Sequence, residues 1–266
     1  MKDFTLSIYS LYLKAIKRNY EEILTFKDFL AMDKKPNKFC ILRHDVDRNP
    51  LYALKMAKLE NRLNISSTYY FRTKKNTFDK KIIKEIFSLG HEIGYHYESL
   101  GDCKGDFRLA YRDFVRNLES LRSLVQIKTV SMHGQPLSKF DNRDLWKKSK
   151  YHDLLTKDLL ILGEIYLDID YSNIAYLTDA GRNWLSNKDN LRDHVNSNIN
   201  LNFHNPSELI KYFISSEDNL IFSTHPERWP FSGSGYLISY LRDKISNYGK
   251  FMLKQLYKDI DVQQNS

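Results

Sequence analysis

Two carboxylates follow a run of apolar residues early in the chain. The segment 39–42 is unbroken apolar sequence, as in a strand buried on both faces of a parallel sheet, and the segment 43–47 (RHDVD) comes directly after it. Because strand side chains repeat their direction every second residue, Arg43, Asp45 and Asp47 point the same way. Neighbouring carboxylates need a positive partner, usually a metal ion or an arginine. The alternative interpretation is a helix N-cap with a surface salt bridge.

Histidines follow three later apolar runs in the same manner. His96, His133 and His225 each stand at the end of a predicted strand, and histidine with carboxylate suits a zinc-like ion that keeps an open coordination position for water. His204 ends another strand candidate and is a reserve ligand or substrate contact. His91 lies five residues before His96, about 16 Å away in an extended chain, so we expect a structural role at the opposite end of the sheet.

The elements that position these residues alternate between strands and helices. After the first strand, strands are predicted at 66–71, 91–96, 129–132 and 220–224, and helices at 51–63, 77–89, 106–124, 207–215 and 235–257. Short strand candidates at 159–162, 165–167, 174–177 and 199–203 cannot be ordered. This alternation predicts parallel βαβ units in one domain, 1–266, with an N-terminal helical extension of about residues 1–35 and a core of about 38–260.

The composition bounds the class of protein. The 266 residues carry a formal net charge of +8, but the lysines are scattered along predicted helix faces, which favours a solvated surface over a nucleic-acid groove. Such a surface can attract an anionic substrate, for example a nucleotide- or lipid-linked sugar. Cys40 and Cys103 form no metal or disulfide pattern and are expected to be free thiols. With no apolar run long enough for a membrane span, we expect a cytoplasmic protein, for which peripheral membrane contact stays open.

Several motifs together resemble the polysaccharide deacetylase family, which comprises metal-dependent carbohydrate esterases on a distorted (β/α)7 barrel. They are the Asp-Val-Asp after a buried strand, the GHEIGYH segment 90–96 and the Thr-His-Pro segment 224–226. The resemblance extends from about Lys38 to Trp229. The RHDVDR opening resembles a divergent branch associated with bacterial surface-polysaccharide gene clusters.

The resemblance implies roles for individual residues. Asp45 matches the family's catalytic base, Asp47 its metal-binding aspartate, His96 its first metal histidine and His225 its general acid. It also implies one divalent ion, with zinc expected, and the hydrolysis of an N-acetyl group on a sugar during surface-polysaccharide assembly.

The third metal ligand is an open question. Leu100 stands where the family has a second metal histidine, four residues after His96. We favour His133 as the replacement, with Glu98 as the alternative, because Glu98 lies two residues beyond His96 and can share its face. Leu100 also motivates two other hypotheses: a catalytically silent carbohydrate-binding protein on the same scaffold, and a hydrolase of another amide or ester.

Two further departures concern orientation and substrate contact. The family's third motif supplies an arginine that orients the catalytic aspartate, and the segment 131–136 has none. Arg43 and Arg182 are the candidates to replace it. Trp184 is a candidate for the tryptophan that lines the family's acetyl pocket, and Trp229 is a further candidate for substrate contact or orientation.

Overall fold

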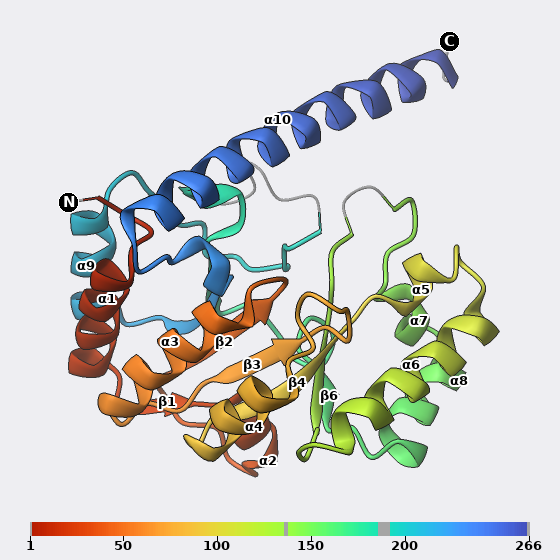
Figure 1. Ribbon diagram of the computed structural model, residues 1–266, viewed down its shortest axis with the longest axis horizontal. Coiled ribbons are helices and arrows are strands. Elements are labelled where there is room, and N and C mark those ends of the chain that lie inside the picture. The colour runs from red at the N-terminus through yellow and green to blue at the C-terminus, as the bar shows by residue number, and fades with distance from the viewer. Residues whose placement is uncertain (1, 136–137, 186–191, 265–266) are drawn as a thin grey trace.

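A parallel β-sheet organises the protein, for which the computed structural model describes residues 2–135, 138–185 and 192–264 (Figure 1). Eight strands pair in the order β6-β5-β4-β3-β2-β10-β7, with β1 also on β2, and every pairing is parallel. The strands are β1 (Glu22–Leu24), β2 (Phe39–Val46), β3 (Thr68–Phe71), β4 (Glu92–Tyr97), β5 (Thr129–Met132), β6 (Gly163–Glu164), β7 (Ile174–Thr178) and β10 (Asn219–Thr224). This curled sheet confirms the predicted distorted parallel α/β barrel, and no pairing among the described residues joins β6 to β7.

Helices connect successive strands and cover the sheet. They are α1 (Leu6–Asn19), α2 (Phe26–Ala31), α3 (Pro50–Arg62), α4 (Lys80–Ser88), α5 (Ser99–Asp102), α6 (Phe107–Arg122), α7 (Asp144–Lys147), α8 (Ser149–Asp153), α9 (Pro206–Ser215) and α10 (Gly233–Gln264). Shorter helical turns are η1 (Leu154–Asp158), η2 (Ala180–Arg182) and η3 (Pro226–Arg228), and β8 (Trp184–Leu185) pairs antiparallel with β9 (Asn202–Phe203). Within the described residues, none of the helices has the length and apolarity that a membrane crossing requires.

Two local expectations are corrected. Between residues 5 and 31 the sequence pattern predicted helices alone, but β1 interrupts them and pairs with the beginning of β2, since three residues are too few to show strand periodicity. The apolar run 159–162 is not a strand. It follows η1 as a loop in which Leu160 has a φ of 51° and the Ile161 amide donates to the Leu155 carbonyl.

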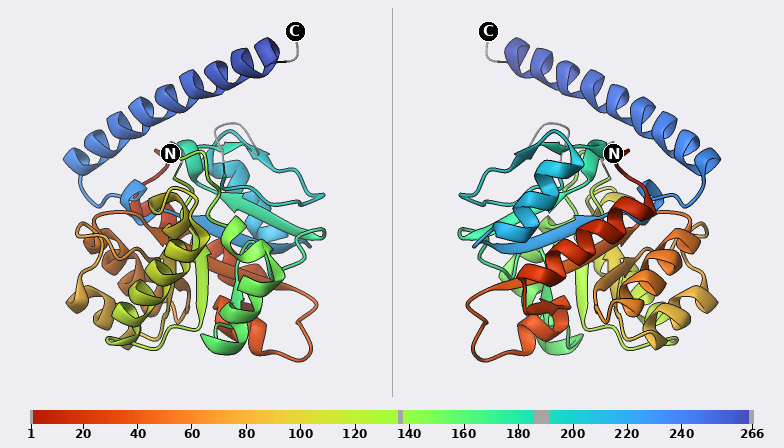
Figure 2. Two further views of the ribbon diagram at one scale, coloured as in Figure 1. Left: turned by 90° about the vertical axis from the view of Figure 1, so that its right-hand side faces the viewer. Right: turned by 90° about the vertical axis from the view of Figure 1, so that its left-hand side faces the viewer.

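The two faces of β2 meet different environments. Cys40 and Leu42 belong to an apolar cluster with α1 and α9, two helices that lie side by side on the outside of the sheet (Figure 2). Ile41 belongs to the cluster on the inner side, so the alternation along the strand also turns Arg43 and Asp45 inward. Arg43 and Asp45 thus point in the same direction, as predicted, because alternate residues of β2 face opposite sides of the sheet.

The GHEIGYH motif has a packing reason. Gly90 ends α4 with a φ of +90°, which is the left-handed region that glycine adopts without strain. A Cβ atom on Gly94 would lie 2.3 Å from carbon atoms of the Tyr70 ring, so only glycine lets that ring pack against β4. The centroid of the Tyr70 ring lies 5.4 Å from the Arg43 guanidinium carbon. The glycine therefore helps place an aromatic face beside the arginine of the RHDVD segment.

A buried polar network ties the outer helices to β2 behind the site. Glu60 of α3 accepts hydrogen bonds from Tyr69 Oη (2.7 Å) and Ser67 Oγ (2.5 Å), and His44 Nε2 lies 2.8 Å from Glu60 Oε1. Burial alone would raise the pKa of Glu60, but His44 and other neighbours lower the pKa to about 2. His91 is also buried in this region, with Nε2 3.0 Å from the Ala57 carbonyl, in agreement with its expected structural role.

Candidate active site

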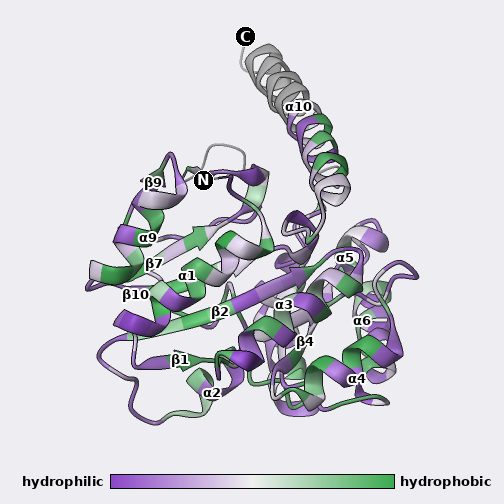
Figure 3. Ribbon diagram, turned by 60° about the vertical axis from the view of Figure 1, so that its left-hand side comes forward, coloured by the Kyte–Doolittle hydropathy of each residue, from purple (hydrophilic) through white to green (hydrophobic). Residues whose placement is uncertain are grey.

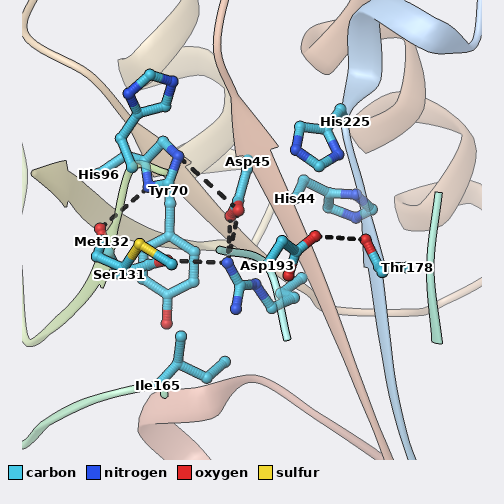
Figure 4. A network of polar contacts seen from close by, with 12 residues as sticks. His44, Asp45, Tyr70, His96, Ser131, Met132, Ile165, Thr178, Asp193 and His225 are labelled. Carbon is cyan, nitrogen blue, oxygen red and sulfur yellow. Dashed lines mark hydrogen bonds and ion pairs between the residues drawn. The ribbon is translucent and has the colours of Figure 1, made fainter. Parts of the chain in front are cut away.

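The five residues predicted at strand ends lie around one cavity. Asp45, Asp47, His96, His133 and His225 all line a space of about 330 Å³ at the carboxyl ends of β2, β4, β5 and β10. The register explains the meeting of distant residues, because parallel neighbours end at the same edge of the sheet. Figure 4 shows His96 and His225 on opposite sides of Asp45.

Asp47, His96 and His133 form a cluster suited to a metal ion. One ligand atom from each residue lies within 4.8 Å of the other two. Asp47 Oδ1 is 3.4 Å from His96 Nε2 and 3.4 Å from His133 Nε2. Ligands placed tetrahedrally around zinc at its usual bond lengths are about 3.3 Å apart. Asp47 Oδ1 is buried without a hydrogen-bond partner, so the cluster fits a divalent cation.

The second ring nitrogen of each histidine lies close to an oxygen atom of a neighbouring residue. His96 Nδ1 lies 3.0 Å from the Ser131 carbonyl oxygen, its register partner on β5, and His133 Nδ1 lies 3.0 Å from Glu98 Oε2. Such contacts fix which nitrogen faces a metal. Both Nε2 atoms consequently turn toward Asp47.

The two candidates for the third ligand have different surroundings. Glu98 stands behind His133 and pairs with Arg72 (Nη2 to Oε2, 2.7 Å) and Lys74 (3.2 Å), while His133 itself joins the cluster. Burial opposes ionisation of Glu98, but His133 and Arg72 lower the pKa of its carboxyl to about 2. Glu98 is therefore placed to orient and polarise His133.

The charged groups of the cluster shift one another's pKa values. Burial opposes the ionisation of Asp47, but His133 and His96 hold the pKa of its carboxyl well below the usual range. Burial likewise disfavours a charged His133, yet Asp47 and Glu98 raise its pKa to about 9. These neighbours thus favour an ionised carboxyl at Asp47 and a positive charge at His133, between the carboxylates of Asp47 and Glu98.

Arg43 holds Asp45 from the inner side of β2. Its Nη2 donates to both carboxylate oxygens of Asp45, at 2.7 and 2.6 Å, and also to Ser131 Oγ at 2.8 Å. Both side chains are buried. The structure accordingly brings Arg43, of the two candidate arginines, to the carboxylate expected to act as base.

His225 is held by a carboxylate that the sequence did not single out. Asp179 lies directly after β7, and its Oδ1 is 2.6 Å from His225 Nδ1 while its Oδ2 accepts from the His225 amide (3.0 Å) and from Trp229 Nε1 (2.7 Å). Arg228 Nη1 also donates to Asp179, at 2.8 Å. Burial and Arg228 lower the pKa of His225, but Asp179 and its other neighbours raise it above the ordinary value. Trp229 thus serves as a buried support of this pair.

Asp193 is a second carboxylate that sequence reasoning missed. It lines the cavity and accepts hydrogen bonds from Thr178 Oγ1 (2.6 Å) and Tyr166 Oη (2.9 Å). Burial opposes its ionisation, while Arg43 and His225 lower its pKa. It lies in the irregular region 140–200, where the sequence has no periodicity that could have placed it.

Two predicted site residues lie elsewhere. Arg182 Nη1 contacts Asp243 Oδ2 (2.8 Å) of α10, and Trp184 packs in the outer cluster, stacked on Phe4 at 5.3 Å between ring centroids. Neither lines the cavity. The reserve ligand His204 is exposed after β9 and does not line the cavity either.

Comparisons with known proteins give distant neighbours. No family model and no curated protein matches the sequence. Among solved structures, the chain is similar to a family 4 carbohydrate esterase from Bacillus anthracis, at 15% identity over 90% of this chain and 86% of that one, with a TM-score of 0.39. It is also similar to a Streptococcus mutans CE4 esterase, at 14% identity over 85% and 86% of the two chains, with a TM-score of 0.44. Both are carbohydrate esterases, the class of enzyme that the sequence motifs resemble.

Proposed function

We propose that this protein is a metal-dependent hydrolase that removes the acetyl group from an N-acetylated sugar. The observation that carries the proposal is the placement of three potential metal ligands, Asp47, His96 and His133, beside the carboxylate of Asp45 in one cavity. Asp45 Oδ2 lies 3.8 Å from His96 Nε2, so a base adjoins the metal cluster without being part of it.

The cluster and the base have separate tasks. A divalent ion held by Asp47, His96 and His133, with zinc proposed, would supply Lewis-acid polarisation of the acetamide carbonyl and of the attacking water. Asp45 accepts the proton of that water, and the two hydrogen bonds from Arg43 fix the direction of its carboxylate.

His225 completes the reaction from the other side of the cavity. Its Nδ1 is held by Asp179, which leaves Nε2 to give a proton to the departing amine. Because Asp179 stabilises the imidazolium, His225 enters the reaction as an acid. The base and the acid thus differ in type, and Asp45 lies near the end of β2 while His225 directly follows β10.

We further propose that the reaction serves surface-polysaccharide assembly in the cytoplasm. This rests on the RHDVDR resemblance and on the two cysteines, both of which are free thiols. Hydrolysis of another amide or of an acetyl ester is the alternative chemistry of the same residues. Analysis of the released acid and of the remaining sugar separates these reactions.

The first experiment measures metal content and acetate release on the same preparations. The wild type, purified without chelator, is expected to carry about one equivalent of zinc or a similar ion. His96→Ala and His133→Ala are expected to lose it, while His204→Ala, which removes an exposed histidine, keeps it.

Activity distinguishes the enzyme from a silent sugar-binding protein. Asp45→Asn is expected to retain the metal and lose acetate release from N-acetylated amino sugars, because the carboxamide cannot accept the proton of water. Metal-loaded wild type that releases no acetate from free, nucleotide-linked or lipid-linked sugars would refute the deacetylase function. Sugar binding that survives both Asp45→Asn and metal removal would establish the silent alternative.

A further inference from the structure

Helix α10 extends away from the rest of the molecule. It runs from Gly233 to Gln264, and the views of Figures 1 and 2 agree that most of its length stands clear of the sheet and its covering helices. Its beginning contacts η2, which directly follows Asp179, and η3, which directly follows His225. The helix is thus attached next to the cavity and free further along.

One face of α10 makes the attachment. Three polar side chains spaced four residues apart lie on this face and bond to η2 and η3. They are Ser239, whose Oγ donates to the Glu227 carbonyl (2.9 Å), Asp243, paired with Arg182 (2.8 Å), and Asn247, whose Nδ2 donates to the Gly181 carbonyl (2.7 Å). Since these contacts fix the rotation of the helix, its remaining faces point away from η2 and η3.

An apolar stripe lies on the part of α10 turned away from this attachment. Its residues follow one another at three- and four-residue steps and are Ile238 (59% exposed), Leu241 (51%), Ile245 (74%) and Tyr248 (66%). Figure 3 shows apolar positions along the described half of α10, outside the body of the protein. The sequence continues the same spacing with Met252 and Leu256. A contiguous exposed stripe of large apolar residues marks an interaction surface.

The charges beside the stripe identify its partner. Arg242 and Lys244 are exposed, whereas Asp243, which is the one carboxylate between residues 233 and 249, is buried against Arg182 and Arg228. Further along, the sequence places lysines at 250, 254 and 258 before the next acidic residue, Asp259. An apolar stripe with basic neighbours matches the interface of an anionic bilayer. A second copy of the helix would instead bring like charges together.

We propose that α10 binds in the plane of an anionic lipid surface and holds the cavity close to it. Ser246 lies on the side of α10 that faces the cavity and lines it, so a surface bound along the opposite stripe is separated from the cavity by the width of one helix, about 10–12 Å. The substrate class that fits an enzyme bound to a bilayer in this way is a lipid-linked N-acetylated sugar. Its lipid remains in the bilayer while its sugar enters the cavity. This last step rests on the proposed deacetylase function.

Vesicle binding tests the surface directly. The probes are vesicles of phosphatidylcholine with and without phosphatidylglycerol, and the readout is cosedimentation of the full chain. Leu241→Asp and Ile245→Asp are each expected to weaken binding to the anionic vesicles on the order of tenfold. Leu109→Asp on α6 is the matched control, because Leu109 is 50% exposed and lies far from α10 in sequence, and its binding is expected to equal that of the wild type.

The outcomes decide each part separately. If the wild type does not bind anionic vesicles, or if the Ile245→Asp variant binds them as well as the wild type does, the proposed lipid-binding surface is refuted. If the wild type does not bind vesicles but forms a dimer in vesicle-free buffer, and Leu241→Asp converts that dimer to a monomer, the stripe binds a second copy of the helix and the lipid proposal is refuted. Vesicle binding by the wild type and by Asp45→Asn alike, with loss in Ile245→Asp, supports it.

Activity then tests the substrate class. Ile245→Asp is expected to lower kcat/KM for a lipid-linked N-acetylated sugar on anionic vesicles on the order of tenfold and to leave a water-soluble N-acetylated sugar unaffected. Equal kcat/KM of both proteins on the lipid-linked sugar overturns the lipid-linked assignment. Absence of acetate release from every sugar, with vesicle binding intact, overturns the proposed function and the substrate class while the lipid-binding helix stands.

Discussion

The buried pair of Arg43 and Asp45 gives a quantitative prediction. Arg43 Nη2 contacts both carboxylate oxygens at 2.7 and 2.6 Å, and the side chains are 0% and 4% exposed. Replacing Arg43 by Met leaves a buried carboxylate without its cation, which costs about 3–5 kcal/mol of unfolding free energy. Asp45→Asn costs less, because the carboxamide oxygen still accepts from the guanidinium. The double variant removes both charges and is expected to be more stable than the sum of the single losses predicts.

A double-mutant cycle measures this coupling. Urea unfolding of the four proteins, followed by circular dichroism in the presence of chelator, keeps metal binding out of the free energies. We expect a coupling of about 1–3 kcal/mol between the two positions. Losses that add to within about 0.5 kcal/mol would refute the view that Arg43 stabilises the protein chiefly through Asp45.

Three further predictions concern groups around the cavity. Glu98→Gln is expected to weaken metal binding about 10- to 100-fold, whereas His133→Ala removes a proposed ligand and is expected to weaken binding more. Competition with a chelating dye measures the metal affinity of both variants. Equal losses of affinity would contradict the position of Glu98 behind His133. Asp179→Asn is expected to lower the pKa of His225, since burial and the neighbouring cation then prevail, and so to shift the alkaline limb of kcat/KM to lower pH. Burial raises the pKa of Glu164 from 4.5 to about 7. The wild type should therefore lose about 3 kcal/mol of stability as the pH rises from about 4.5 to about 7, and Glu164→Gln should remove that slope in urea unfolding.

The strand-end residues could be predicted because one geometric rule governs them. Parallel strands end at a common edge, so a polar residue after each apolar run projects toward the same cavity. Asp179 obeys this rule after β7 and could have been found by applying it to the short strand candidates as well. The sequence favours His133 over Glu98 but leaves Glu98 open, because spacing shows a shared face and does not show that Glu98 pairs with Arg72 and Lys74.

The residues that sequence reasoning misplaced depend on packing between distant segments. The family resemblance suggests Arg182 and Trp184 for the cavity, in the roles of the family's orienting arginine and pocket tryptophan. Arg182 instead finds Asp243 of α10, and Trp184 stacks on Phe4 near the N-terminus. Such partners lie about sixty and one hundred and eighty positions away in the chain, and no local pattern specifies them. Asp193 is a similar case, since Thr178 and Tyr166 hold it from other segments.

Asp45 and Asp47, the proposed base and the proposed metal ligand, have different positively charged neighbours in the one cavity. Asp45 Oδ2 lies 3.8 Å from His96 Nε2, close enough for Asp45 to join Asp47 as a ligand if its oxygens were free. Arg43 occupies both of them, while Asp47 Oδ1 has no hydrogen-bond partner and faces two imidazole nitrogens. In the proposed reaction, Arg43 therefore neutralises Asp45, whose remaining lone pairs can accept a proton, and Asp47 is left as the carboxylate that faces the metal cluster. The position of Arg43 two residues before Asp45 on the same strand makes this separation a property of the RHDVD segment itself.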